Sequence, residues 1–112
     1  MNTKGKKYED IAANVLNIKG YKIISRNFSC KLGEIDIIAL KGGILHFIEV
    51  KGGKDTFGDP AYRVNYKKLE KIMKVGDFFI SINKQLSFQE VQIDVISITD
   101  DGKINYYPSQ RL

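Results

Sequence analysis

Several residue types with which small proteins build reactive or stabilising sites are nearly absent from this chain. Its 112 residues include one cysteine, one histidine and no tryptophan. The single cysteine, Cys30, excludes an internal disulfide and any cysteine-based zinc site. The single histidine, His46, is the only residue through which a Ser–His–Asp or Cys–His catalytic set could operate. The chemistry of this protein is therefore expected to rest on other side chains.

Long apolar segments and a strong charge imbalance are also absent. No apolar run approaches the roughly 20 residues needed to cross a bilayer. The basic residues at 1–7 are followed by Glu9 and Asp10 rather than by the apolar core of a signal peptide. We therefore expect a soluble, cytoplasmic protein. The net charge of +5 permits a polyanionic partner but does not demand one.

The chain has enough apolar residues to build one core. Hydrophobic residues make up 43% of the sequence, and this length predicts a single domain, 1–112. Helical apolar spacing predicts two helices, and β-branched segments bounded by turn residues predict five strands. The expected helices cover 3–19 and 65–82, and the expected strands cover 21–29, 34–40, 44–51, 91–98 and 103–107.

The order of these elements predicts the sheet. A strand, a helix and a strand follow one another between 44 and 98, and such a crossover favours parallel pairing of the two strands. The pair Gly42–Gly43 is typical of a two-residue hairpin and predicts that its flanking strands are antiparallel. The sequence thus predicts an α/β fold with a mixed five-stranded sheet flanked by helices, in the order αβββαββ.

Charged residues interrupt two of the most apolar predicted strands. Glu34, Asp36, Glu49 and Lys51 alternate with aliphatic neighbours, and burial of a charge is costly unless it is paired or bound to a metal. If the glycine pair forms the turn, counting outward places Asp36 opposite Glu49 and Glu34 opposite Lys51. The two-residue period of a strand then puts all four side chains on one face of the sheet.

The facing carboxylates point to a specific chemistry. Glu34 opposite Lys51 is an ordinary cross-strand ion pair, whereas Asp36 opposite Glu49 places two like charges together. Either one carboxyl group holds a proton or a cation lies between the two. Mg²⁺ is commonly held by one or two carboxylates together with water and substrate phosphate. A lysine two residues along the same face would complete a site for metal-assisted hydrolysis of phosphodiesters.

The ordered set of motifs resembles a known family. The segments 33–39 (GEIDIIA) and 47–51 (FIEVK) are similar to the YraN-like family of small bacterial proteins. They also resemble the PD-(D/E)XK motif of restriction-endonuclease-like nucleases and, more distantly, the archaeal Holliday-junction resolvases. The resemblance to the YraN-like family extends over nearly the whole chain. Its further matching positions are 9–12, 20–27, 57–60, 68 and 94–96.

The resemblance implies a fold, an activity and a set of site residues. The fold would be the restriction-endonuclease-like core, and the activity a Mg²⁺- or Mn²⁺-dependent endonuclease, with DNA, branched DNA included, favoured over RNA. Asp36, Glu49 and the Val50 carbonyl would hold the metal. Lys51 would orient or help to deprotonate water, and Glu9 would add a ligand or position water. Resolvase-like members also suggest a homodimer.

Basic residues that follow Lys51 in the chain are candidates for phosphate contacts. Lysines on a helix are equally typical of a solvated face, so this interpretation depends on whether they flank the carboxylates. Tyr62 and Tyr66 are candidates for stacking on unpaired bases. With three arginines in the chain, we expect recognition of nucleic-acid shape rather than of sequence. The predicted nucleic-acid-binding residues are Lys54, Arg63, Lys67, Lys68 and Lys71.

Two other functions stay open at this point. One is a non-catalytic nucleic-acid-binding module of the same fold, and the other is a partner-binding protein with a vestigial site. Glu9 is also compatible with an ordinary surface charge near a helix N-terminus. Asp94 and His46 are expected to have structural roles, because Asp94 lies among aliphatic residues and His46 falls on the face opposite Glu49.

Overall fold

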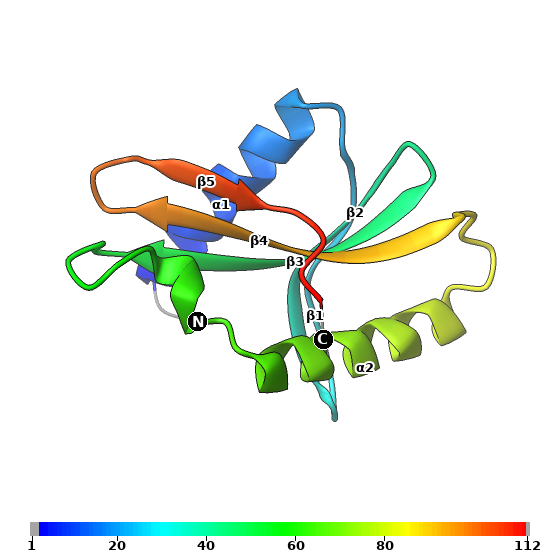
Figure 1. Cartoon of the computed structure of the whole chain (residues 1–112). Coiled ribbons are helices and arrows are strands. Elements are labelled where there is room, and N and C mark those ends of the chain that lie inside the picture. Colours follow the sequence, from blue (N-terminus) through cyan, green and yellow to red (C-terminus); the bar gives the residue numbers. More distant parts are fainter. Residues whose placement is uncertain (1–2, 112) are drawn as a thin grey trace.

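One mixed sheet lies between two helices in the computed structural model, which describes residues 3–111 (Figure 1). The predicted αβββαββ order is confirmed, with a short 3₁₀ helix added before the second α-helix. Within the described residues, no helix has both the length and the apolarity needed to span a membrane. The elements are α1 (Thr3–Ile18), β1 (Lys22–Cys30), β2 (Gly33–Lys41), β3 (Ile44–Gly53), η1 (Pro60–Arg63), α2 (Tyr66–Ile82), β4 (Glu90–Thr99) and β5 (Ile104–Tyr107).

The strands lie in chain order across the sheet, and only β3 and β4 are parallel. Helix α2 makes the crossover between these two strands, as the sequence predicts. The register counted from the glycine pair is also confirmed, since the β2–β3 pairs run from Lys41–Ile44 to Ile37–Ile48. This register brings Asp36 and Glu49 to the position just beyond the last of those pairs.

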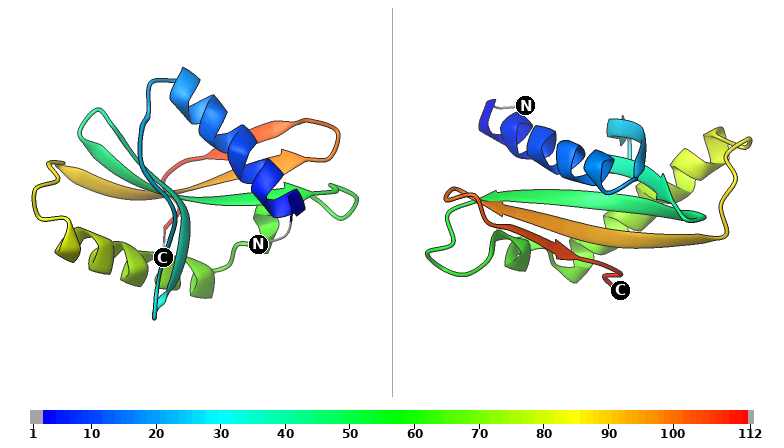
Figure 2. Two further views of the ribbon diagram at one scale, coloured as in Figure 1. Left: turned by 180° about the vertical axis from the view of Figure 1, so that it is seen from behind. Right: turned by 90° about the horizontal axis from the view of Figure 1, so that it is seen from above.

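The two helices cover opposite faces of the sheet (Figure 2). Each helix buries an apolar stripe against one face of the central strands. Successive side chains of a strand point to opposite faces, so alternate residues pack against each helix. Helix α2 passes so close to β3 that a Cβ atom at Gly76 would lie 2.2 Å from the Phe47 ring. The core on the α1 side includes Ala12, Leu16, Ile37, Ile48 and Ile96, and the core on the α2 side includes Ile38, Phe47, Leu69, Ile72 and Val75.

The sheet divides at the end of the β2–β3 pairing. Beyond Ile37, strand β2 stays with β1 as far as the turn between them, whereas β3 stays with β4 as far as the pair Gly53–Thr99. Figure 1 shows the β1–β2 hairpin turning away from β3 and β4 at this point. The divergence leaves Asp36 and Glu49 at the opening between two strands that no longer pair.

A kink in both strands of the hairpin accompanies this divergence. Asn27 of β1 adopts a left-handed conformation with φ of 54°, which asparagine tolerates better than most residues. Across from it, the alternation of β2 is broken at Asp36, because Ile35 packs in the α2-side core and Ile37 in the α1-side core. The hairpin therefore changes direction at the residues that border the opening.

Candidate functional site

A pocket of about 440 Å³ lies where β2 leaves β3. Its walls include all four residues predicted to be catalytic, together with Val50, so α1, β2 and β3 all contribute to it. The predicted residues in this wall are Glu9, Asp36, Glu49 and Lys51, and Gly5, Tyr8, Gly52, Gly53 and Arg63 complete it. Residues up to 58 positions apart in the sequence are thus gathered around one cavity.

The Asp36 and Glu49 carboxyl groups share a hydrogen bond inside this pocket. Burial of Asp36, together with the hydrogen bond and charge of Glu49, raises the pKa of Asp36 to about 8. The backbone N–H of Val50 donates to Asp36 Oδ2 over 2.8 Å and opposes this rise, as does the charge of Lys68. Without a metal, the facing carboxylates thus adopt one of the two expected remedies, because they hold one proton between them at neutral pH.

Lys68 comes from α2, on the face of the sheet opposite α1. Its Nζ lies 3.0 Å from Oε2 of Glu49. Burial alone would lower the pKa of Lys68, but the charge and hydrogen bond of Glu49 outweigh burial and raise it. The side chain of Asn65 caps α2 by accepting the Lys68 N–H over 3.0 Å, which fixes the first turn of the helix beside β3. The sequence predicted Lys68 as a phosphate contact and missed this ion pair.

The predicted pairing of Glu34 with Lys51 is wrong. Glu34 is exposed and pairs with Ser29 of β1, and no ion pair joins it to Lys51 within residues 3–111. The physical reason is the divergence of β2 from β3, which begins before Glu34 is reached. Lys51 instead borders both the pocket and a neighbouring basic surface.

Glu9 reaches the pocket from α1 and is 7% exposed. Burial and the nearby charge of Asp36 raise its pKa, while a hydrogen bond from Asn27 lowers it. Oε1 of Glu9 and Oδ1 of Asn27 are both buried and have no hydrogen-bond partner among the described residues. Glu9 is thus a buried site residue rather than a surface charge. Asn27 was missed, and the only signal for it was an asparagine inside an otherwise β-forming segment.

A second hollow of about 240 Å³ adjoins the pocket and is lined by cationic side chains. We call this surface, formed by Lys51, Arg63, Asn65, Lys67, Lys68 and Lys71, the basic groove. Lys51 and Arg63 border both hollows, so the groove continues directly from the pocket. Four of the five predicted nucleic-acid-binding residues therefore gather beside the carboxylates. Lys54 does not line either hollow.

The donor set of the pocket is suited to a hard divalent ion that keeps water and substrate ligands. Within residues 3–111, no three Asp, Glu, His or Cys side chains form a cluster that could hold a metal alone. Asp36 and Glu49 supply two carboxylates, and Val50 lies beside them in the same wall of the pocket. Two carboxylates with open positions match the way in which Mg²⁺ is bound next to phosphate groups.

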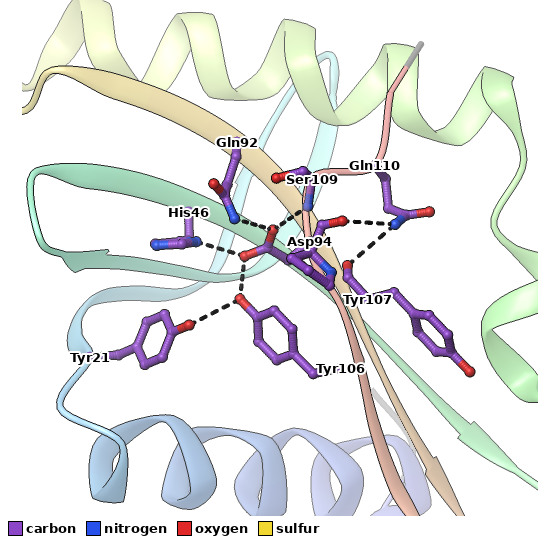
Figure 3. A network of polar contacts seen from close by, with 9 residues as sticks. Tyr21, His46, Gln92, Asp94, Tyr106, Tyr107, Ser109 and Gln110 are labelled. Atoms are coloured by element: carbon purple, nitrogen blue, oxygen red, sulfur yellow. Dashed lines mark hydrogen bonds and ion pairs between the residues drawn. The ribbon is translucent and has the colours of Figure 1, made fainter.

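Asp94 organises a separate polar cluster that lies outside the pocket (Figure 3). Its side chain is fully buried, with Oδ2 2.6 Å from His46 Nδ1 and within hydrogen-bond reach of the Tyr106 hydroxyl. The Ser109 N–H donates to Oδ1 over 2.9 Å. Burial opposes ionisation, but these hydrogen bonds outweigh it and lower the pKa of Asp94. The cluster ties β3, β4 and the C-terminal segment together, in keeping with the structural roles expected for Asp94 and His46.

Comparison with known proteins identifies the family. A model of the family described as "Uncharacterised protein family UPF0102" matches residues 8–98, a span that includes every wall residue of the pocket except Gly5. The chain belongs to this family. The YraN-like resemblance predicted from the sequence is thereby confirmed.

Relatives in this family match the chain over most or all of its length. A UPF0102 protein of Petrotoga mobilis is 67% identical over 112 residues, which cover 100% of both chains. A UPF0102 protein of Dictyoglomus turgidum is 42% identical over 101 residues, covering 88% of this chain and 85% of the relative. One from Fervidobacterium nodosum is 44% identical over 100 residues, covering 88% and 74%. The similarity therefore extends to the whole fold rather than to one motif.

The shared proton predicts how stability depends on pH. The folded metal-free protein retains a proton on Asp36 up to about pH 8, whereas the unfolded chain releases it near the ordinary value of 3.8. The contribution of this group to the free energy of unfolding is therefore largest below pH 3.8 and declines as the pH rises toward 8. Urea unfolding of Asp36→Asn between pH 4 and 9 should show a shallower decline than the unsubstituted protein.

The control for this measurement is Asp77→Asn, which removes an exposed carboxylate from α2. It should reproduce the pH dependence of the unsubstituted protein. Equal pH dependence for Asp36→Asn and the unsubstituted protein would contradict a proton held between the two carboxyl groups.

Proposed function

We propose that this protein is a Mg²⁺- or Mn²⁺-dependent nuclease that hydrolyses phosphodiester bonds of nucleic acids, with DNA, branched DNA included, as the favoured substrate. The observation that carries this proposal is the pair of adjoining carboxyl groups, half-buried Asp36 and buried Glu49, in a pocket that continues into the basic groove. Carboxylates attract a divalent ion, and the cations beside them attract phosphate. A nucleic acid, with its chain of phosphodiesters, is a substrate that uses both at one site.

The metal would be held by the Asp36 and Glu49 carboxylates and the Val50 carbonyl. When bound, a divalent ion supplies the Lewis acidity that polarises the phosphoryl group and favours deprotonation of water. Its binding would displace the proton that the two carboxyl groups share, so affinity should increase with pH. The charge of the ion would replace that proton in relieving the repulsion between Asp36 and Glu49.

The side chains around the carboxylates have distinct roles in this proposal. The Lys51 ammonium group offsets the negative charge that develops on the phosphate during hydrolysis. Glu9 has an unpartnered buried oxygen and a raised pKa, which suit it to accept a proton from water at neutral pH. Lys68 neutralises Glu49 across 3.0 Å and would be free to contact phosphate once a cation is bound by the carboxylates.

A non-catalytic nucleic-acid-binding module is the second candidate function, and one observation favours it. The two carboxyl groups share one proton, and Lys68 lies 3.0 Å from Glu49, so the site is already balanced in charge without a metal. A protein that had lost catalysis would keep the fold and the basic groove in this state. Metal binding and cleavage therefore distinguish the two candidates.

Metal binding should stabilise the folded protein. Because the ion binds only where the folded chain brings the carboxylates together, saturating Mn²⁺ should raise the melting temperature by several degrees. Asp36→Asn should lose most of this response, and Asp77→Asn should retain it. Differential scanning fluorimetry at pH 8 provides the measurement. An equal response in Asp36→Asn and the unsubstituted protein would place the metal elsewhere.

Cleavage should depend on Lys51 more than binding does. With Mn²⁺ present, Lys51→Ala should cleave labelled linear or four-way-junction DNA at least about 100-fold more slowly, because one stabilising charge on the transition state is removed. Its affinity for the same DNA should change by only a few-fold. Efficient cleavage by Lys51→Ala, after removal of contaminating nucleases, would refute the role of this lysine. Binding without any cleavage by the unsubstituted protein would favour the non-catalytic module.

Nucleic-acid affinity should depend on the basic groove and on salt. The double substitution Lys67→Ala with Lys71→Ala should weaken binding about equally for unrelated sequences and reduce the slope of log K against log[salt] by about 2. Lys68 is left unchanged because its substitution would also disturb Glu49. Lys74→Ala is the matched control, since this lysine lies on the same helix outside the groove. A salt-independent affinity, or no effect of the double substitution, would move the interface elsewhere.

A further inference from the structure

Three exposed aromatic side chains lie on the segment that leads from the pocket to the basic groove. Phe57, Tyr62 and Tyr66 are 101%, 78% and 60% exposed. Single exposed apolar residues are common on protein surfaces, but three aromatic rings within ten residues are a concentration that indicates an interaction surface. Figure 1 shows this segment in green, as the loop after β3 followed by η1 and the start of α2.

The positions of these residues connect them to the site. Tyr62 precedes Arg63, which borders both the pocket and the basic groove. Tyr66 lies between Asn65 and Lys67, two residues of the groove. Phe57 follows Gly53 of the pocket wall by four residues, which is at most about 14 Å of extended chain. Tyr62 and Tyr66 therefore directly adjoin cationic residues of the groove in the chain, and Phe57 lies on the short loop that leads to them.

The segment is held in place although its rings are exposed. The Gly58 N–H donates to the Asp55 carbonyl over 3.0 Å, which closes a turn with Phe57 at its corner. A Cβ atom at Gly58 would lie 3.0 Å from the Tyr62 ring, so this ring packs beside the same turn. A platform that is ordered before binding loses less conformational entropy when it binds.

Anchors on both sides of η1 complete this support. The Asp59 carboxylate accepts the Ala61 N–H over 2.8 Å and the Asn105 side-chain amide over 3.0 Å, and it also accepts the Tyr107 hydroxyl. The Arg63 guanidinium donates to the Gly52 carbonyl over 2.7 Å. These contacts tie the segment to β3 and β5 without covering the three rings.

We propose that Phe57, Tyr62 and Tyr66 form a stacking platform for unpaired nucleobases. The preferred substrate is then a nucleic acid that presents unpaired nucleotides beside the cleaved phosphodiester. This inference rests on the proposed function. Aromatic rings stack on the faces of bases, and those faces are accessible only where the bases are not already stacked in a duplex. The adjacent groove of cations favours this occupant over an apolar protein segment, because each unpaired base carries a phosphate with it.

The absence of tryptophan from the chain allows a direct test of stacking. Phe57→Trp introduces a single indole at the corner of the turn and preserves an aromatic face. Its fluorescence should be quenched when the protein is saturated with a duplex that contains a short single-stranded gap. When the protein is saturated with the fully paired duplex of the same length, most of the indole fluorescence should remain unquenched. No quenching by the gapped duplex, or equal quenching by both, would overturn the platform.

Affinity measurements provide an independent readout of the same idea. The unsubstituted protein should bind the gapped duplex at least about tenfold more tightly than the paired one, as expected for stacking on one or two bases. Phe57→Leu and Tyr66→Ala should each reduce this preference without changing the affinity for the paired duplex. Phe57→Trp should retain the preference. Ile18→Ala, which removes an 85% exposed apolar side chain at the end of α1, is the control and should change neither affinity.

The outcomes separate this inference from the proposed function. If the unsubstituted protein binds neither duplex at low salt, both are overturned. If it binds and cleaves both duplexes equally well, the proposed function stands and the platform is refuted. A preference for the gapped duplex that survives both Phe57→Leu and Tyr66→Ala would also refute the platform, because another surface would then be responsible.

Discussion

The structure is organised around one unfavourable contact, the approach of the Asp36 and Glu49 carboxyl groups to each other. Like charges at this separation are tolerated only when a proton, a hydrogen-bond donor or a cation compensates them. Here the compensation comes from a shared proton, the Val50 N–H and the Lys68 ammonium group. In the proposed function, a divalent ion would replace the proton and the Lys68 ammonium group would contact phosphate. Compensated in this way, the two carboxyl groups can lie side by side within the fold.

The divergence of the sheet makes this contact accessible. If β2 and β3 had stayed paired, Asp36 and Glu49 would lie within a continuous ladder under one of the helices. Instead β2 follows β1, and the kink at Asn27 opens a space that side chains from both layers enter. Glu9 comes from α1 and Lys68 from α2, although the two helices cover opposite faces. The carboxyl ends of the parallel strands β3 and β4 lead to the same end of the sheet, where α/β proteins commonly place their sites.

Three kinds of surface follow one another along a short stretch of chain. The carboxylate and lysine of β3 come first, the exposed rings of the loop and η1 follow, and the lysines of α2 come last. This arrangement combines attraction for a cation, for the face of a base and for a phosphate group. In the proposed function, the lysines and the cation act on the phosphate of a nucleotide and the rings contact its base.

The sequence by itself determined the elements, their order and the facing of Asp36 and Glu49. These features depend on local rules: helical and strand periodicity, the crossover between β3 and β4, and the glycine pair that sets the hairpin register. Only the tertiary structure decided the partners of these residues. Glu34 does not pair with Lys51 because the sheet divides before that position. Asn27 contacts Glu9 because the hairpin bends there, and Lys68 contacts Glu49 because α2 packs closely on β3. Such contacts depend on the twist of the sheet and on the packing between layers. Residues that are distant in the sequence determine both, so no local sequence pattern predicts them.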